Sequence, residues 1–368
     1  MKTKIMFIHT ITNTPYKHSY YNLLSNNFDV HVIQLAHHSE IRNWQSLEDK
    51  KYSEYVIFHG YINYRKKLQS VFKIVKLIRQ INPAMIIAHG YHRIEFLLVP
   101  WFFKKRILAC ETATTFSDRT RVYWKERIKS LVLNKTFHYF FTYGSASKNY
   151  LVQDLGINPE KVFVKGNFSH LQLQKYTQNE FSKREKRILF VGRFAEEKNI
   201  FTLIDAFTVF EQKNKSGYTL TLVGTGELKG KITGYVKSLN IASQIEFVAY
   251  QNSDELVSYY QNSKLFVLPS FSEPWGQVIN EAMYFALPIV ISKNCGSAED
   301  LCKENARKFD PKSKDELIAI FNELLNNESE LERMSKASLS LIKNFKPALL
   351  IEKQVAFLND ILVQSTEN

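Results

Sequence analysis

Glu273 and Glu281, two carboxylates eight residues apart, are the side chains whose spacing points most directly to a chemical role. Glu273 falls in a turn-rich loop after a short apolar run, residues 264–269, which predicts a buried strand. Glu281 falls in a segment with apolar residues at helical spacing. In a parallel α/β sheet, the loops after the strands meet at the ligand-binding edge, and a helix start offers N–H groups to an anion. The pattern therefore predicts a ligand with phosphate and paired hydroxyl groups, such as a nucleotide sugar.

The alternative interpretation is that Glu273 is an ordinary loop charge and Glu281 a solvated helix residue. The chain contains 36 acidic residues, so many such pairs arise by chance. Gly276, which lies between the two, favours a binding role because glycine lets the backbone approach a ligand closely. The choice depends on whether matching motifs occur elsewhere in the chain.

Two cations, Arg193 and Lys198, lie between a predicted strand at residues 188–191 and a predicted helix at residues 199–212. At the same sheet edge they would neutralise a diphosphate and stabilise its charge as the leaving group departs. A solvated basic loop is the alternative interpretation. Gly192 directly precedes Arg193 and follows the strand.

The next predicted strand, residues 218–223, leads into a second glycine motif, with Gly224 and Gly226. A lone G-x-G pattern is typical of a turn and is weak evidence of binding. Residues 248–251 end a further strand, and Gly296 lies in a loop after the strand at residues 288–292. Each motif is weak by itself, but all of them follow strands, in a fixed order.

Taken in order, these motifs resemble the signature of the retaining glycosyltransferases of family 4, which have the GT-B fold. The resemblance covers nearly all of residues 187–302. It implies that Arg193 and Lys198 bind the diphosphate of a nucleotide sugar. It also implies that Glu281 binds the ribose and Glu273 the sugar. No metal or other cofactor is implied beside the nucleotide sugar as co-substrate. The donor side would further include Gly192, Gly224, Gly226, Trp275, Gly276 and Gln277.

The first half of the chain matches the family less well. The glycine-rich loop that many members have after the first strand is replaced by residues 9–18, which contain no glycine. Tyr16 and its neighbours Lys17 and His18 could substitute for it. After the predicted fifth strand, where many members carry a histidine, this chain has Glu111. The acceptor-side residues that follow from these positions are His89, Glu111 and Tyr16, with a purely structural role as the alternative for His89.

Length and element order predict an α/β fold. A chain of 368 residues with 45% hydrophobic content suffices for two domains. Both halves alternate short apolar strands with helices, which is typical of doubly wound, mostly parallel sheets. With the resemblance, this becomes the GT-B fold, with two Rossmann-like domains facing a cleft. We predict an acceptor-binding domain at residues 1–170 and a linker at residues 171–186. A nucleotide-sugar-binding domain follows at residues 187–345, and a C-terminal helix at residues 346–368 returns to the first domain.

The excess of positive charge is confined to the first half of the chain. Residues 1–170 contain 25 Lys and Arg against 11 Asp and Glu, whereas the remainder is nearly balanced. Basic clusters occur at residues 65–67, 104–106 and 119–129, and the last mixes five cations with aromatic and aliphatic residues. Such a segment is typical of a contact with an anionic membrane surface, or of an ordinary amphipathic helix. A phosphate-bearing acceptor would also fit, whereas nucleic acid is the less favoured partner.

We expect a cytoplasmic protein that is peripheral on the inner face of the cell membrane. No apolar run approaches the roughly 20 residues that span a bilayer. The start of the chain lacks the core of a signal peptide, and the three cysteines lack disulfide or zinc spacing.

The sequence thus predicts a metal-independent, retaining hexosyltransferase. It would move a sugar from a nucleotide sugar, most often a UDP-sugar, to a lipid-linked or phosphate-bearing glycan in cell-surface polysaccharide biosynthesis. Two alternatives stay open: a GT-B enzyme that glucosylates DNA, and a non-catalytic partner subunit of the same fold. Binding that weakens steeply with salt would mark the first alternative.

Overall fold

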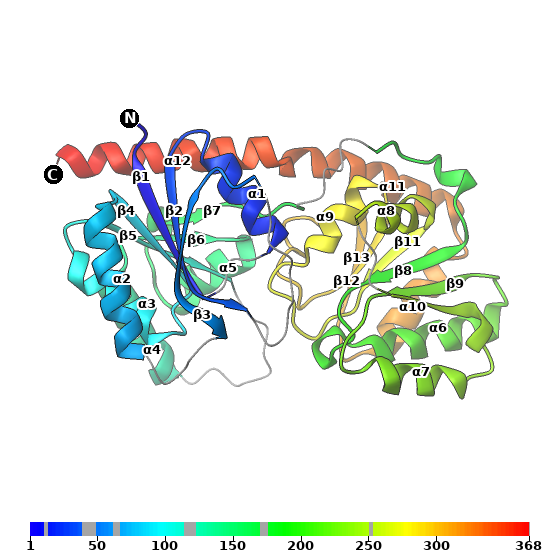
Figure 1. The fold of residues 1–368 in the computed structure, drawn as a ribbon. Coiled ribbons are helices and arrows are strands. Elements are labelled where there is room, and N and C mark those ends of the chain that lie inside the picture. Colours follow the sequence, from blue (N-terminus) through cyan, green and yellow to red (C-terminus); the bar gives the residue numbers. More distant parts are fainter. Residues whose placement is uncertain are drawn as a thin grey trace. The chain divides into compact units, whose positions relative to one another are not determined.

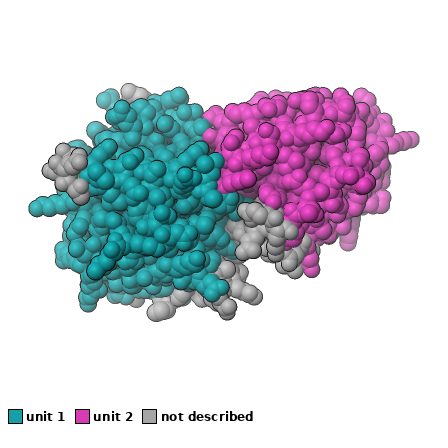
Figure 2. All heavy atoms as spheres, turned by 90° about the horizontal axis from the view of Figure 1, so that it is seen from above, with its two compact units in different colours: residues 1–113, 119–170, 347–368 teal, residues 114–118, 171–346 magenta. Residues whose placement is uncertain are grey.

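The computed structural model describes residues 1–10, 14–38, 49–61, 67–113, 123–169, 176–249 and 253–367. The chain forms two compact units (Figure 2). Unit 1 comprises residues 1–113, 119–170 and 347–368, and unit 2 comprises residues 114–118 and 171–346. Each unit has one parallel sheet covered by helices (Figure 1), as the alternation of strands and helices predicts.

Unit 1 is built on a seven-stranded sheet in the order β3-β2-β1-β4-β5-β6-β7. The strand order reverses at β1, which pairs in parallel with β2 on one side and with β4 on the other. This is the doubly wound topology that binds ligands at the carboxyl ends of its strands. The strands are β1 (Lys4–His9), β2 (Asp29–His38), β3 (Ser53–Tyr61), β4 (Met85–His89), β5 (Ile107–Thr112), β6 (Tyr139–Thr142) and β7 (Val162–Val164).

Alternate residues of β1 face different helices. Met6 and Ile8 lie in the core that α2 closes with Ile74, whereas the ring of Phe7 packs on Tyr21 of α1 at 4.9 Å. The helical stretch at residues 94–103 is divided into two elements, because Pro100 cannot donate a helical hydrogen bond. The helical elements are α1 (Pro15–Leu24), α2 (Lys67–Ile81), α3 (Ile94–Leu98), η1 (Val99–Phe103), α4 (Tyr123–Thr136), α5 (Ser145–Asn149), η2 (Tyr150–Asp154) and η3 (Pro159–Lys161).

The C-terminal helix α12 (Pro347–Glu367) belongs to unit 1, as predicted for the GT-B fold. Its Phe357 stacks on Phe163 of β7 with ring centroids 4.6 Å apart. Its Gln354 side chain is buried and donates to the hydroxyl of Tyr20 in α1 at 2.6 Å. The last residues of the chain therefore complete the core of the unit that its first residues begin.

Unit 2 has a six-stranded parallel sheet in the order β10-β9-β8-β11-β12-β13. Its strands are β8 (Arg187–Val191), β9 (Thr219–Val223), β10 (Ile245–Val248), β11 (Leu265–Leu268), β12 (Ile289–Ser292) and β13 (Ala306–Phe309). Its helical elements are η5 (Phe181–Lys183), η6 (Glu196–Lys198), α6 (Ile200–Asn214), α7 (Lys229–Lys237), η7 (Ala242–Gln244), α8 (Ser253–Asn262), α9 (Gln277–Tyr284), α10 (Lys314–Leu324), α11 (Glu328–Ile342) and η8 (Lys343–Phe345).

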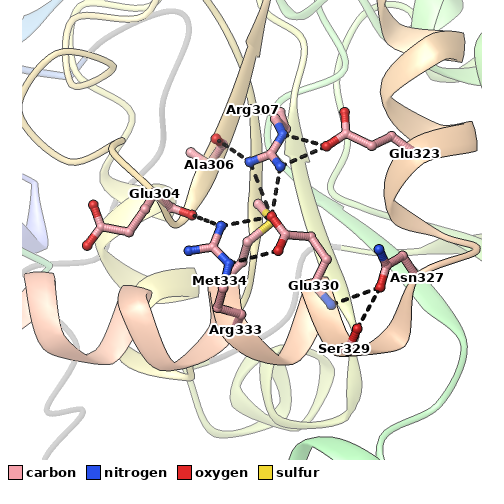
Figure 3. Close-up of polar contacts among 9 residues, drawn as sticks. All are labelled: Glu304, Ala306, Arg307, Glu323, Asn327, Ser329, Glu330, Arg333 and Met334. Carbon is pink, nitrogen blue, oxygen red and sulfur yellow. Dashed lines mark hydrogen bonds and ion pairs between the residues drawn. The ribbon is translucent and has the colours of Figure 1, made fainter.

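The edge strand β13 was not predicted, because its four residues carry two cations at the centre. An arginine network ties it to the two helices that follow (Figure 3). Arg307 donates to Glu323 of α10 at 2.7 Å and to Glu330 of α11 at 2.8 Å. Arg333 also donates to Glu330, and the two arginines hold the pKa of this carboxyl at about 2. Side-chain pairing thus supplies what the apolar pattern of β13 lacks.

Residues 176–186 belong to the stretch predicted as a linker, and they pack on unit 2. The buried guanidinium of Arg184 donates to the carbonyls of Ser263 at 3.4 Å and Ala286 at 3.2 Å. The structure therefore counts this segment with unit 2. Among the helices in the described ranges, none has the length and apolarity needed to cross a bilayer.

Candidate functional site

The predicted donor residues lie in three loops, at the carboxyl ends of β8, β9 and β11, and in α9, which follows the third loop. The loop after β12 adjoins them. Backbone hydrogen bonds join these loops to one another. After β8, the Gly192 N–H donates to the carbonyl of Val223 at 3.0 Å, and the Phe194 N–H donates to that of Thr225 at 2.8 Å. The loop that carries Arg193 is therefore fixed against the glycine loop after β9.

The loop after β11, which carries Glu273, is held on both sides. The Phe271 N–H donates to the carbonyl of Glu197 at 2.9 Å. The Glu273 N–H donates to the carbonyl of Asn294 at 3.0 Å, and the Glu273 carbonyl accepts from the Gly296 N–H at 2.8 Å. Backbone hydrogen bonds thus join the loops that carry the predicted motifs into one continuous surface.

Glycines make this contact between loops possible. A Cβ on Gly224, whose φ is +146°, would lie 2.0 Å from the carbonyl oxygen of Gly192. A Cβ on Gly226 would lie 2.5 Å from the carbonyl oxygen of Phe194. Gly296 stands in the same relation to the carbonyl of Pro274, at 2.0 Å. These glycines are required by the packing of one loop on the next.

We expect Gly224→Ala to lower the free energy of unfolding by about 2–3 kcal/mol, because the new methyl group forces the loops apart and the backbone is strained. Gly234→Ala is the matched control, since this residue lies within α7 and a Cβ there meets nothing within 4 Å. The control should be neutral or stabilise by about 0.5–1 kcal/mol through helix propensity. Urea denaturation of both variants measures the difference, and equal stabilities would contradict the packing role.

The structure brings Lys198 and Glu273 together from different loops. The ammonium group donates to a carboxylate oxygen of Glu273, and both side chains are largely buried. Arg193, nearby on the same loop as Lys198, pairs with Glu197 at 2.5 Å and reaches Glu227 at 4.0 Å. The two predicted diphosphate cations are therefore each held in place by a carboxylate.

Glu281 lies inside α9 and is only 4% exposed. Its Oε2 accepts a hydrogen bond from the buried hydroxyl of Tyr260 at 2.8 Å. Gly276 is the N-cap of α9 with φ +82°, a left-handed conformation that favours glycine. A glycine cap has no side chain to accept from the first-turn N–H groups, which is the arrangement that anions use at helix starts.

The indole of Trp275 is buried within its own loop, and its N–H donates to the side-chain oxygen of Asn280 at 2.9 Å. Its predicted contact with the donor stays a prediction, as does that of Gln277, the first residue of α9. Of residues 248–251, which end β10, the last two lie outside the described residues.

The sequence reasoning gave no role to Asn199, which organises this site. It adopts the left-handed conformation, with φ +54°, and joins Lys198 to α6. Its buried amide donates to the carbonyl of Pro269 at 3.1 Å and to that of Pro311 at 2.8 Å. Asparagine before a helix is one of the few non-glycine residues that favour this conformation, and that was the available signal.

In unit 1, the predicted residues His89 and Glu111 lie at the carboxyl ends of β4 and β5, beside Lys165 after β7. The Glu111 cluster consists of Glu111, Lys17, Lys165, His89 and Tyr143. One oxygen of Glu111 accepts from Lys17 at 2.5 Å and from the Tyr143 hydroxyl at 2.5 Å. Lys165 lies 3.2 Å from the same oxygen, and so does the ring nitrogen Nδ1 of His89. The sequence predicted His89 and Glu111 for the acceptor side and weighed Lys17 only as a substitute for the glycine-rich loop. Lys165 and Tyr143 were missed.

The Glu111 cluster contains more buried cations than carboxylates. Lys17, Lys165 and Glu111 are all at most 5% exposed. Burial would raise the pKa of Glu111, but the ammonium groups of Lys165 and Lys17 outweigh it and lower this pKa. Burial lowers the pKa of Lys165 to about 8, whereas the neighbouring carboxylate keeps that of Lys17 raised despite its burial. Burial also lowers the pKa of His89, to about 4.

These contacts fix the start of α1. Lys17 lies in the first turn of α1, and the bond from Lys17 to Glu111 ties this helix to β5. Lys17 belongs to the stretch that, by the resemblance, replaces a glycine-rich loop. The Glu111 carboxylate is 1% exposed, and its contact with an acceptor stays a prediction. Tyr16 is half-buried and, with Lys165, lines a cavity of about 10 Å³. Residues 11–13, within the stretch weighed as a substitute for the glycine loop, lie outside the described residues.

We expect Lys165→Met to remove a pH dependence of stability. The pKa of Lys165 in the folded state is about 8, below the ordinary lysine value of 10.5, so between these values the unfolded chain binds more protons than the folded one. The free energy of unfolding of the wild type should therefore rise, relative to the variant, by about 2 kcal/mol from pH 8 to pH 10. Urea denaturation at several pH values measures this difference, and parallel profiles would contradict it.

Known proteins resemble this chain in sequence and in fold. Residues 173–340 match the family model of glycosyl transferases group 1, which spans most of unit 2. The amylovoran biosynthesis glycosyltransferase AmsD of Erwinia amylovora is 27% identical over 80% of this chain and 82% of its own length.

A second relative covers a shorter part. An α-1,4-N-acetyl-D-galactosaminyltransferase of Campylobacter jejuni, named for a diphospho-undecaprenol-linked glycan, is 28% identical over 33% of each chain. Among solved structures, HepE of Anabaena in complex with UDP-glucose superposes with a TM-score of 0.74, at 18% identity, over 97% of this chain and 99% of its own. The chain therefore has the GT-B fold and is an enzyme that transfers glycosyl groups, and the region that matches the group 1 model lies in unit 2.

Proposed function

We propose that the protein is a retaining hexosyltransferase that uses a nucleotide sugar, a UDP-sugar in particular. The observation that carries the proposal is the Lys198–Glu273 pair, formed between loops 75 residues apart in the chain and flanked by Arg193. This pair would place a cation for the diphosphate next to a carboxylate for the sugar. The UDP-glucose complex of HepE, which shares the fold, supports the choice of UDP.

The observed pairs are compatible with donor binding. A lysine ammonium has three donors and an arginine five, so Lys198 and Arg193 could hold their carboxylates and phosphate oxygens at once. As the bond to the diphosphate breaks, both cations would stabilise the developing negative charge. Glu273 would accept hydrogen bonds from the sugar. Glu281 would accept from the ribose, because the bond from Tyr260 uses one of about four lone-pair positions.

In this proposal the acceptor attacks from the face that the nucleotide leaves, and the leaving phosphate helps to take its proton. Transfer would need no metal ion and no other cofactor. The anomeric configuration of the product and activity in the presence of a chelator test these two points directly.

We propose a lipid-linked or phosphate-bearing glycan as the acceptor, in cell-surface polysaccharide biosynthesis. The relatives named above support it: one acts in amylovoran biosynthesis and the other on a glycan linked to undecaprenol diphosphate. Unit 1 would bind this acceptor, with Tyr16, His89 and Glu111 on that side.

Such an acceptor implies a protein on the inner face of the membrane, and one surface of unit 1 supports this. Two elements, α4 and η1, expose large apolar side chains there. α4 exposes Trp124, Ile128 and Leu131, at helical spacing, by 58%, 52% and 61%. The neighbouring η1 exposes Trp101 and Phe102, and the Trp101 N–H donates to Thr136 at the end of α4 at 3.3 Å. The part of the predicted membrane segment at residues 119–122 lies outside the described residues.

Thermal denaturation with UDP, GDP, ADP, CMP and TDP, in the presence of a chelator, tests the donor site. A nucleotide at 100 times its dissociation constant stabilises the folded state by about 2.7 kcal/mol. We expect UDP to raise the melting temperature of the wild type, and Glu281→Gln to abolish that shift. Glu332→Gln, at a half-exposed ion pair of α11, is the control and should keep it. No shift with any nucleotide, or an unchanged shift in Glu281→Gln, would contradict the proposal.

A further inference from the structure

Unit 1 contains a groove at the amino ends of its strands, on the opposite edge from the Glu111 cluster. Its volume is about 940 Å³. The floor is formed where β4 to β7 begin, and one wall is formed by the C-terminal half of α12, with Phe357 and Ile361. Figure 1 shows this half of α12 lying over the starts of the strands. Because the strands are parallel, this edge is not the one at which the predicted acceptor residues meet.

The groove is basic. Lys104, Lys105, Arg106 and Lys161 line it, against the carboxylates Glu160 and Asp360. Within the described ranges, no ion pair joins any of the three lysines to a carboxylate. Arg106 donates to the side chain of Asn82. The lysines therefore present their charge to the groove or to solvent, and an anion would be the complementary ligand.

His138 also lines the groove and adds a neutral hydrogen-bond donor to it. Its Nδ1 accepts a hydrogen bond from the backbone N–H of Leu108 at 3.1 Å, so in the neutral ring the proton lies on Nε2. Burial and the nearby Lys161 lower its pKa, which favours this neutral form. The groove thus combines point charges with an N–H donor, the combination by which proteins bind phosphate oxygens.

The surroundings indicate the source of the phosphate. The Lys104 ammonium lies 4.7 Å from the ring centroid of Trp101, one of the exposed apolar residues beside α4. Tryptophan next to lysine is typical of a membrane–water interface, where the ring meets the headgroup region. The groove is also far larger than a single phosphate ion requires.

We propose that this groove binds the phosphate headgroup of an anionic membrane lipid, separately from donor and acceptor. The choice of a lipid as the ligand rests on the proposed membrane-bound function. The prediction that the groove binds an anion rests only on its basic residues. The two surfaces would act together: the apolar residues of η1 and α4 enter the interface, and the groove selects for negative charge.

The test is binding of the full chain to vesicles of phosphatidylglycerol with phosphatidylcholine, and to vesicles of phosphatidylcholine alone. The groove variant combines Lys104→Gln, Lys105→Gln and Lys161→Gln. Each basic residue near an anionic surface is worth about 1 kcal/mol, so we expect it to bind the anionic vesicles roughly a hundredfold more weakly. The matched control removes the same charge from unit 2 through Lys213→Gln, Lys229→Gln and Lys237→Gln, and should bind as the wild type does.

A second pair of variants separates headgroup from apolar contact. Ile128→Ser with Leu131→Ser, both at exposed positions of α4, should weaken binding to anionic and neutral vesicles alike, by tenfold or more.

Equal losses of vesicle binding in the groove variant and in the control would mean that the attraction is non-specific and depends on charge alone, and would overturn the proposal. So would anionic binding by the groove variant that matches the wild type.

Two further probes decide the source of the anion. If millimolar sodium phosphate raises the melting temperature of the wild type but not of the groove variant, and vesicles do not bind, the ligand is free phosphate and the lipid is ruled out. Tighter binding of a DNA duplex through the same lysines would assign the groove to nucleic acid instead. The UDP-induced shift reports on unit 2 independently, so failure of the donor site and failure of the groove give different results.

Discussion

Replacing Lys198 with methionine should reduce the rate of glycosyl transfer by about 100- to 1,000-fold, the usual effect of removing one group that stabilises developing charge. The ammonium is the donor nearest Glu273 at the sheet edge of unit 2, and methionine keeps the length of the side chain without its charge. If Lys198 acts on the leaving diphosphate, kcat should fall more than the Michaelis constant for the donor rises.

Lys293→Met is the control for this experiment. Lys293 lies in the loop after β12 and pairs at 3.4 Å with Glu316, but it is 56% exposed. An exposed pair of this kind contributes at most about 1 kcal/mol, so the control should keep both its stability and its activity. A folded Lys198→Met enzyme with wild-type turnover would show that the diphosphate is neutralised elsewhere.

The second large effect concerns stability. Glu111→Leu should lower the free energy of unfolding by about 3–5 kcal/mol, because it leaves the ammonium groups of Lys17 and Lys165 buried without their carboxylate. In a unit of this size, the melting temperature should fall by roughly 10 °C. The effect is large because the carboxylate is 1% exposed and accepts from several donors at once.

Two comparisons make this prediction specific. Adding Lys17→Met to Glu111→Leu should restore much of the lost stability, since an apolar pair can replace a buried ion pair at little cost. Glu180→Leu removes an exposed carboxylate, paired with Lys183 at 2.8 Å, and should change stability by less than about 1 kcal/mol. If the double variant were less stable than Glu111→Leu, the charge imbalance would not be the cause.

Most of the fold could be predicted because local patterns of apolar residues determine most of its strands and helices. Apolar runs such as residues 264–269 and 288–292 became the buried strands β11 and β12, within one or two residues at each end. The strand β13 escaped, because Arg307 and Lys308 occupy its centre and its stability comes from partners on α10 and α11. A short edge strand with polar residues gives no periodic signal.

The candidate residues of the two units differ in the same way. In unit 2 the residues of interest sit directly after strands, so their order in the chain predicts their order along the sheet edge. In unit 1, Lys17 and Lys165 lie far apart in the sequence, and both contact Glu111 in the structure. No spacing rule connects them, and nothing in the sequence shows that both lysines are buried beside one carboxylate.

The return of α12 has a consequence for synthesis of the chain. Unit 2 is essentially one continuous segment, residues 171–346, whereas unit 1 needs residues 347–368 to cover Tyr20 and Phe163. On the ribosome, the second sheet can therefore form and close while the first still lacks its last helix. We expect the nascent unit 1 to expose that apolar face until residues 347–367 have been synthesised, so that unit 1 begins to form first but is completed after unit 2.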